Sequence, residues 1–298
     1  MSVSKSLTKV FNASKIINYN DKSKFIFLSD CHRGDNSSAD NFAPNRHIYM
    51  SALDYYYDKG FTYIEIGDGD ELWENDKFSD LIKAHTDIYL KMSKFHKEGR
   101  FYMIWGNHDI YKCNHKYVQK NLYEYYNPKT GQLEPLFDNL QAYEGLILKH
   151  ESTGHKIFVV HGHQGDLLND TLWPVARFLV RYVWRHIEIL KYNNPLSPSR
   201  NIIRLYKIEN ELMNWAEDNN QIIICGHTHR SAYAIPGKTP YFNDGCCCRK
   251  GYITGIEIEN NEISLIRWSR GYSAKSMRKV EREVISGPIN IESFLINK

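Results

Sequence analysis

The chain has 298 residues, of which 42% are hydrophobic and 24% are charged, values that are ordinary for a globular protein. Its net charge of +3 is too small to predict nucleic-acid binding from bulk electrostatics, so we expect no stable nucleic-acid partner. There is no apolar run of about 18 residues and no apolar secretory leader, and we therefore expect a cytoplasmic protein without a membrane span.

The N-terminal third alternates between strand and helix patterns. Residues 24–29 (KFIFLS) are expected to form a strand, and helical periodicity follows over residues 46–59. Further strands are expected over residues 61–66 and 100–105, with helical residues 78–97 between them. This alternation predicts β-α-β units and a parallel sheet.

The second half contains two more strand patterns, residues 156–160 and 221–225. From residue 232 to residue 268, short strands with turn signals predict antiparallel hairpins that complete a second sheet. Three consecutive cysteines, Cys246 to Cys248, lie in this region. The chain has no CxxC pair, so we interpret the thiols as reduced packing residues rather than as redox groups.

Polar residues follow the end of each main expected strand, where parallel sheets bind their ligands. In chain order the blocks are Asp30-x-His32, Gly67-Asp68, Gly106-Asn107-His108-Asp109, His161-Gly162-His163 and Gly226-His227-Thr228-His229. Residues i and i+2 of an extended segment point to the same side. We therefore expect Asp30 and His32, and likewise His227 and His229, to form pincers, each pair binding from one side. Carboxylate, imidazole and amide oxygen donors together favour hard or borderline divalent metal ions.

The five blocks, in this order, resemble those of the calcineurin-like metallophosphoesterase superfamily, over Asp30 to His229. The resemblance implies a four-layer α/β sandwich, two mixed sheets flanked by helices, as a single domain of residues 1–298. It also implies two divalent metal ions (Mn, Fe or Zn, with Mn favoured) and hydrolysis of a phosphoester or pyrophosphate bond by a metal-bound hydroxide.

The resemblance further implies a role for each block. One ion would be held by Asp30, His32, Asp68 and His229, and the other by Asp68, Asn107, His161 and His227. Two divalent ions outweigh the two carboxylates and one hydroxide by one positive charge, which attracts a phosphate. His108 is expected to stabilise or protonate the leaving oxygen, and Asp109 to fix its tautomer. We expect His163 to support the site rather than bind a metal ion.

The residues after Asp68 bear on the branch of the superfamily. Protein serine/threonine phosphatases have Gly-Asp-x-Val-Asp-Arg-Gly, whereas residues 67–74 here lack Arg-Gly. Residues 67–73 of this chain have the pattern Gly-Asp-x-x-acid-x-Trp. This pattern is similar to that of bacterial UDP-2,3-diacylglucosamine hydrolases, which cleave a pyrophosphate. The sequence departs from those enzymes at His108, where they commonly have Arg, and at His163, where they have Asp. We expect a nucleotide- or lipid-linked pyrophosphate substrate, with a nucleotide phosphodiesterase or nuclease, or a non-catalytic scaffold, as alternatives.

Residues 166–217 are expected to form an inserted helical cap, because helical patterns are broken there by a Pro/Ser-rich stretch. Within it Arg177, Arg181 and Arg185 recur at i, i+4 and i+8. Three interpretations stay open. The helix packs on the domain or in a homodimer interface, its arginines bind the substrate phosphate as part of a lid, or it makes peripheral contact with an anionic membrane.

Overall fold

Seven strands form the larger of two sheets in this computed structural model, which describes residues 2–165, 202–271 and 279–295. One half is parallel, in the order β2 (Phe25–Leu28), β3 (Thr62–Ile66), β4 (Phe101–Ile104) and β7 (Ala142–Tyr143). Beyond β2 the sheet continues antiparallel through β12 (Tyr252–Glu259), β13 (Glu262–Arg270) and β14 (Val280–Asn290). The sheet is therefore mixed.

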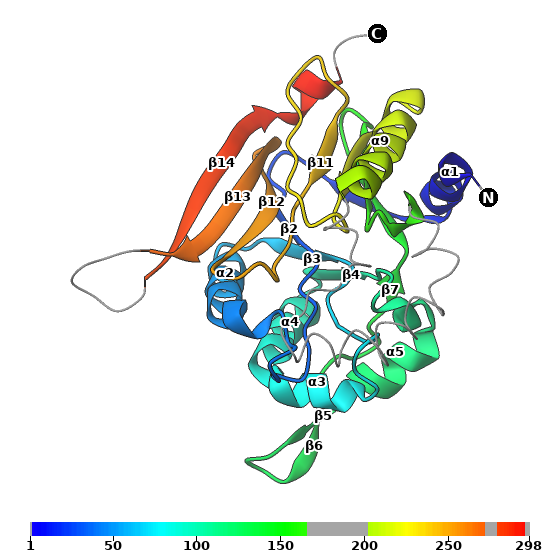
Figure 1. Cartoon of the computed structure of the whole chain (residues 1–298). Helices are drawn as coiled ribbons and strands as arrows, with labels where there is room; N and C mark the ends of the chain where they lie inside the picture. The colour runs from blue at the N-terminus through cyan, green and yellow to red at the C-terminus, as the bar shows by residue number, and fades with distance from the viewer. Residues whose placement is uncertain (1, 166–201, 272–278, 296–298) are drawn as a thin grey trace.

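The smaller sheet has the order β1 (Lys15–Tyr19), β8 (Gly145–His150), β9 (Lys156–Val160), β10 (Ile222–Cys225) and β11 (Tyr241–Asn243). Neighbours are parallel except β8 and β9. A separate hairpin, β5 (Glu124–Asn127) and β6 (Gln132–Pro135), projects from the other elements (Figure 1). The smaller sheet is thus mixed as well.

Helices cover the outer faces of both sheets (Figure 1). The larger sheet is covered by α2 (Arg46–Asp58), α3 (Phe78–Ala84), α4 (Thr86–Lys97) and α5 (His115–Leu122). The smaller sheet is covered by α1 (Val3–Ala13) and α9 (Ile202–Asp218). Short 3₁₀ turns, η1 (Ala43–Asn45), η2 (Ile110–Cys113), η3 (His163–Gly165) and η6 (Ile291–Phe294), complete the described elements.

The layers follow from the two-residue period of buried strands. In β9, Ile157 and Val159 pack between the two sheets, whereas Phe158 contacts α1 and α9, where Trp215 is buried. Because successive side chains of a strand point to opposite faces, an apolar run of this kind needs cover on both sides. The expected four-layer α/β sandwich, two mixed sheets flanked by helices, is confirmed.

The helical residues expected over 78–97 are confirmed, and they form two helices because the chain leaves helical geometry at His85. One expectation for the strands needs correction. Beyond residue 232, β12 and β13 do form an antiparallel hairpin, but it extends the larger sheet through β2, and β11 runs parallel to β10. The turn signals predicted the hairpin without indicating which sheet it joins.

The expected cap falls mostly on residues 166–201, outside the described residues. Its last part is α9, whose Ile208, Leu212 and Trp215 pack against the smaller sheet. Within the described ranges, no helix is both long and apolar enough to cross a membrane. The cap and its arginines stay predictions.

A buried charge network lies beneath the carboxyl ends of the larger sheet. Arg33 is fully buried, and its Nε and Nη1 donate to Asp70 Oδ1 at 2.8 Å and Glu65 Oε1 at 2.7 Å. Lys112 Nζ lies 2.6 Å from Asp70 Oδ2 and 2.7 Å from Asp109 Oδ2. Burial by itself would raise the pKa of Asp70, but Arg33 and Lys112 lower it overall. The network ties together the loops that follow β2, β3 and β4.

Replacing Arg33 with Met should therefore destabilise the fold by about 3–5 kcal/mol, because two buried carboxylates lose their shared partner. The matched control is Arg267→Met, which removes the exposed pair between Arg267 and Glu283 and should cost about 0–1 kcal/mol. Urea unfolding of both variants in the presence of a chelator measures the two values. Equal stability losses would contradict this account of the network.

Candidate metal centre

The loops after the central strands are joined to each other by backbone hydrogen bonds. Asp30 N donates to Gly67 O at 3.1 Å, and His32 N donates to Asp68 O at 2.9 Å. On the smaller sheet, Gly226 N donates to His161 O at 3.0 Å. The polar blocks that the sequence places at separate strand ends thus lie side by side.

An unusual backbone conformation directs the side chains inward. Among described non-glycine residues, ten have a positive φ, and five of these are asparagines, which tolerate that region. The other five are predicted metal ligands: Asp30, His32, Asp68, His227 and His229, with φ between 49° and 69°. Such backbone costs roughly 1–3 kcal/mol a residue and clusters at functional sites. These residues are not extended, so the expectation that pairs at i and i+2 form pincers on extended segments is wrong.

The first group of converging side chains consists of Asp30, His32 and His229, whose ligand atoms lie within 4.8 Å of one another. Asp30 Oδ1 is 3.0 Å from His229 Nε2 and 3.8 Å from His32 Nε2. Asp30 Oδ2 is held by the N–H of His227 at 2.8 Å and by the hydroxyl of Ser29. One carboxylate oxygen therefore stays directed at the two imidazoles.

The second group consists of Asp68, His161 and His227, all buried. His161 Nδ1 donates to the carbonyl of Ile66 at 2.7 Å, which leaves Nε2 directed at Asp68 Oδ2, 3.2 Å away. The same Asp68 oxygen is 3.9 Å from His32 Nε2 in the first group. Asp68 thus stands between the two groups. His227 belongs to the second group and His229 to the first, although only one residue separates them in the chain.

Asn107 completes the set. Its side chain is 1% exposed, and neither its amide oxygen nor its amide nitrogen has a hydrogen-bond partner among the described residues. Buried amides are nearly always paired, so an orphaned one directly before His108, whose N–H donates to Asp68 Oδ1, fits a ligand-binding role. Oxygen and nitrogen donors of this kind fit hard or borderline divalent ions, and the residues present therefore fit a metal centre.

The metal-free groups hold protons that a metal ion would displace. Burial lowers the pKa of His229, but Asp30 raises it overall to about 10. Burial likewise opposes the protonation of His161, whereas Asp68 raises its pKa overall to about 9. Since metal ligation needs neutral imidazole, binding at neutral pH is expected to release protons.

His108 is fixed on three sides. Its Nδ1 lies 2.8 and 2.9 Å from the two oxygens of Glu71, and its ring stacks on Trp73 with centroids 4.1 Å apart. Its backbone N–H donates to Asp68 Oδ1 at 2.8 Å. Glu71 also lies 2.8 Å from His32 Nδ1. Burial would raise the pKa of Glu71, but His108 and His32 lower it overall to about 2, so this carboxylate is charged at neutral pH.

The expected role of Asp109 is therefore corrected. Its Oδ1 accepts from the N–H of Gly106 at 2.7 Å, and its Oδ2 accepts from Gly69 N at 3.2 Å and Lys112 Nζ at 2.7 Å. Asp109 thus belongs to the loop and the buried charge network, and Glu71 is the carboxylate that contacts His108. Adjacency in the sequence favoured Asp109 as the partner of His108. The sequence signal for the true contacts was the pair Glu71 and Trp73, which follow Asp68.

The remaining predicted residues lie at the margin of the site or outside it. The His163 ring is 5.5 Å from that of His161 and 5.3 Å from that of Trp105, and His163 is not part of either three-residue group. Arg177, Arg181 and Arg185 fall outside the described residues. Their expected contact with substrate stays a prediction.

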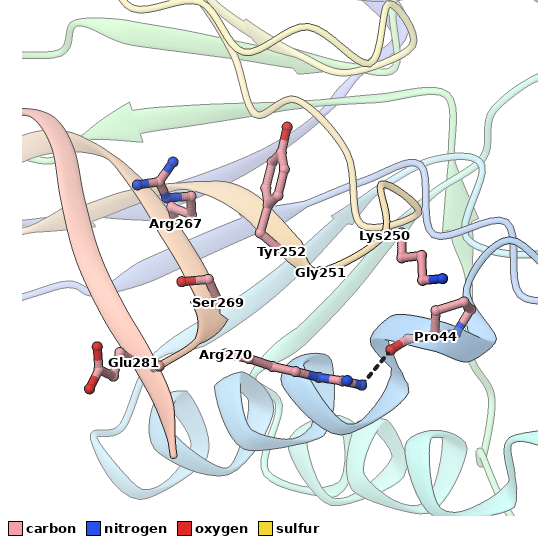
Figure 2. Close-up of a pocket in the computed structure, with 9 residues that line it drawn as sticks. Pro44, Lys250, Gly251, Tyr252, Arg267, Ser269, Arg270 and Glu281 are labelled. Carbon is pink, nitrogen blue, oxygen red and sulfur yellow. Dashed lines mark hydrogen bonds between the residues drawn. The ribbon is translucent and has the colours of Figure 1, made fainter. Parts of the chain in front are cut away.

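A cavity of about 640 Å³ is lined by residues 250–252, which follow the cysteines in the chain, and by residues of β13 (Figure 2). Its charged side chains are three cations, Lys250, Arg267 and Arg270, and one carboxylate, Glu281. Arg270 donates to the carbonyl of Pro44 at 3.1 Å, and Arg267 is paired with Glu283. Residues 248–250 thus connect the neighbourhood of His229 with a basic hollow.

Residues 23–231 match the family model of calcineurin-like phosphoesterases. A comparison with curated proteins finds no match. Among solved structures, a cold-active protein-tyrosine phosphatase of a psychrophilic Shewanella species is 16% identical over 91% of this chain and 83% of that chain, with a TM-score of 0.41. Vps29 of Chaetomium thermophilum is 9% identical, with 89% and 96% covered and a TM-score of 0.38. GAP50 of Plasmodium is 11% identical, with 89% of each chain covered and a TM-score of 0.43.

Replacing Glu71 with Gln should weaken Mn²⁺ binding by roughly 10–100-fold, because a hydrogen-bonded carboxylate behind a ligating imidazole sets its tautomer and basicity. Isothermal titration of metal-free protein measures the change. The control is Glu134→Gln, which alters contacts within the β5–β6 hairpin and should leave binding unchanged. An unchanged affinity in Glu71→Gln would show that Glu71 does not support His32 as a ligand.

Proposed function

The chain belongs to the calcineurin-like phosphoesterase family, and we propose that it hydrolyses a phosphoester or pyrophosphate bond at a centre of two divalent metal ions. The observation that carries the proposal is the position of the Asp68 carboxylate, 3.2 Å from His161 and 3.9 Å from His32, between two ligand groups. A carboxylate so placed suits a bridging ligand. In this proposal the ions are held by Asp30, His32, Asp68 and His229, and by Asp68, Asn107, His161 and His227.

When bound, a pair of ions neutralises phosphate charge and supplies a nucleophile from water of lowered pKa. We propose Mn²⁺ ahead of Fe or Zn, because the donors are oxygen and nitrogen and none of the seven is a thiolate. The chain itself supplies orientation. His161 and His32 are each fixed through Nδ1, so that Nε2 is the nitrogen turned toward the carboxylates.

His108 is proposed to donate a proton to the leaving oxygen. Its Nδ1 is engaged by Glu71, so Nε2 is the atom left to meet the substrate. The His108 side chain is 18% exposed, so a substrate can reach it. Stacking on Trp73 restricts the rotation of its ring. The charged Glu71 carboxylate stabilises the protonated imidazole before transfer, and general acid catalysis of this kind contributes roughly 10²–10⁴-fold.

Among the alternatives, a non-catalytic scaffold would have no use for a strained backbone at five ligand positions. A nucleotide phosphodiesterase or nuclease uses the same chemistry, and it differs from a pyrophosphatase in the group that leaves. We propose that the chain lies nearest the UDP-2,3-diacylglucosamine hydrolase-like branch and that its substrate is a nucleotide- or lipid-linked pyrophosphate. The basic cavity supports this choice, since Lys250 and Arg270 would meet anionic parts of a substrate that extends past the metals.

The proposal is tested with two variants that should separate chemistry from metal binding. Asp68→Asn should lose both ions and all activity, because it removes the shared ligand. His108→Ala should keep the ions and lower turnover by roughly a hundredfold. Elemental analysis of Mn²⁺-loaded protein, with hydrolysis of mono-, di- and pyrophosphate esters, measures both. Wild-type protein that binds two ions and hydrolyses none of these esters would refute the proposed function.

The basic cavity gives a prediction about substrate size. Lys250→Ala should raise the KM for a nucleotide-linked pyrophosphate by roughly tenfold, since a hydrogen bond to a charged group contributes about 1.5–3 kcal/mol. The KM for a small chromogenic ester, which reaches only the metals, should stay unchanged. Lys238→Ala, in the loop before β11, serves as the control for loss of one surface charge. An equal change for both substrates would mean that the cavity does not hold the substrate.

A further inference from the structure

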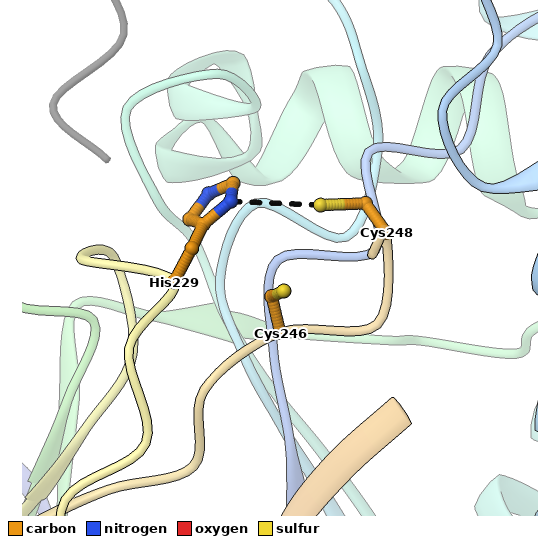
Figure 3. Close-up of side chains that lie close together, drawn as sticks. All are labelled: His229, Cys246 and Cys248. Atoms are coloured by element: carbon orange, nitrogen blue, oxygen red, sulfur yellow. Dashed lines mark hydrogen bonds between the residues drawn. The ribbon is translucent and has the colours of Figure 1, made fainter. Parts of the chain in front are cut away.

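Two thiols lie against the side of the His229 ring that faces away from Asp30. His229 Nε2 is 3.0 Å from Asp30 Oδ1, whereas its Nδ1 is 3.5 Å from Cys248 Sγ. Cys246 Sγ joins this cluster, and the three ligand atoms of His229, Cys246 and Cys248 lie within 4.8 Å of one another (Figure 3). Two sulfurs and one imidazole nitrogen thus converge beside the candidate centre.

We propose that Cys246, Cys248 and His229 form a further site, which binds a thiophilic metal ion such as Zn²⁺, Cd²⁺ or Cu⁺. Tetrahedral zinc with metal–sulfur bonds of about 2.3 Å and metal–nitrogen bonds of about 2.0–2.1 Å places sulfur and nitrogen about 3.6 Å apart. The separation of His229 Nδ1 and Cys248 Sγ, 3.5 Å, agrees with that edge. Thiolates select soft ions, whereas the carboxylates of the neighbouring centre select harder ones.

The loop holds both thiols in place without a metal ion. Cys247 is fully buried in the core beneath the larger sheet, whereas Cys246 and Cys248 on either side of it both lie with His229. Asn45 Nδ2 donates to the carbonyls of Cys247 at 2.9 Å and Arg249 at 2.7 Å, which fixes the backbone on both sides of Cys248. Cys246 N donates to Thr254 Oγ1 at 3.2 Å. A preformed arrangement lowers the ordering cost of binding.

Access distinguishes Cys248, the outer of the two thiols, from the packing cysteines. Cys31, Cys225 and Cys247 are fully buried, and packing accounts for them. Cys248 and His229 are partly exposed, so an ion can enter and a water molecule can take the fourth position of a tetrahedron. Binding releases the two thiol protons and, because Nε2 belongs to the first ligand group, the Nδ1 proton of His229 as well, so it is weaker at low pH.

The test is a titration of the full-length, Mn²⁺-loaded protein with Cd²⁺, followed by the ultraviolet charge-transfer absorption of cadmium thiolates. We expect one equivalent to saturate the band, and each of Cys246→Ser and Cys248→Ser to reduce it by at least half. Cys113→Ser, which replaces an exposed thiol outside the cluster, is the control and should keep the full band. Asp68→Asn should keep it too, which separates this site from the proposed hydrolytic centre.

A band of wild-type intensity in Cys248→Ser, or one that disappears in Cys113→Ser, would overturn the proposal. Because Cys246 is buried, its replacement could also disturb folding, and a second measurement on unaltered protein is needed. X-ray absorption of protein with one added equivalent of Zn²⁺ should show sulfur neighbours at about 2.3 Å. A zinc shell of oxygen and nitrogen alone would exclude the thiol site.

Discussion

The Asp68 carboxylate requires a neighbour without a side chain, because a Cβ on Gly106 would lie 2.2 Å from its Oδ1. The same requirement recurs at Gly226, where a Cβ would lie 2.6 Å from Asp30 Oδ2. Each of these glycines stands directly before a predicted ligand, Asn107 or His227. The blocks therefore bring backbone and carboxylate into direct contact. The contact of Gly226 with Asp30 joins the ends of the two separate sheets.

Beneath this contact lies the charge network of Arg33, Glu65, Asp70, Asp109 and Lys112. Its members come from β3 and from the loops after β2, β3 and β4, which also carry ligands of both groups. Burial of charge is costly unless every member is paired, so the network holds the loops in one arrangement. The strained backbone of Asp30, His32 and Asp68 is stable because these loops cannot relax independently.

Much of the fold, and the convergence of the candidate side chains, could be predicted from the sequence, since strand period and polar residues at strand ends report directly on a layered sandwich. The partner of His108 could not, because adjacency in the chain favoured Asp109, whereas Glu71 reaches His108 across the loops that follow β3 and β4. Membership of β12 and β13 in the larger sheet was also hidden, since a turn signal specifies a hairpin but not its neighbour. Both features depend on contacts between residues far apart in the sequence, Glu71 with His108 and β12 with β2.

The imidazole of His229 separates two kinds of donor. On its Nε2 side lie carboxylates and imidazoles, and on its Nδ1 side lie two thiols on a loop held by Asn45. Carboxylates select hard ions and thiolates select soft ions. The two sites can therefore share one ring and still bind different metals. An ion on Nδ1 replaces the proton of that nitrogen, so the ring holds both ions as an imidazolate, and its Nε2 is then a stronger donor than that of neutral imidazole. The thiol side is therefore placed to tune the first ligand group through His229 while remaining outside it.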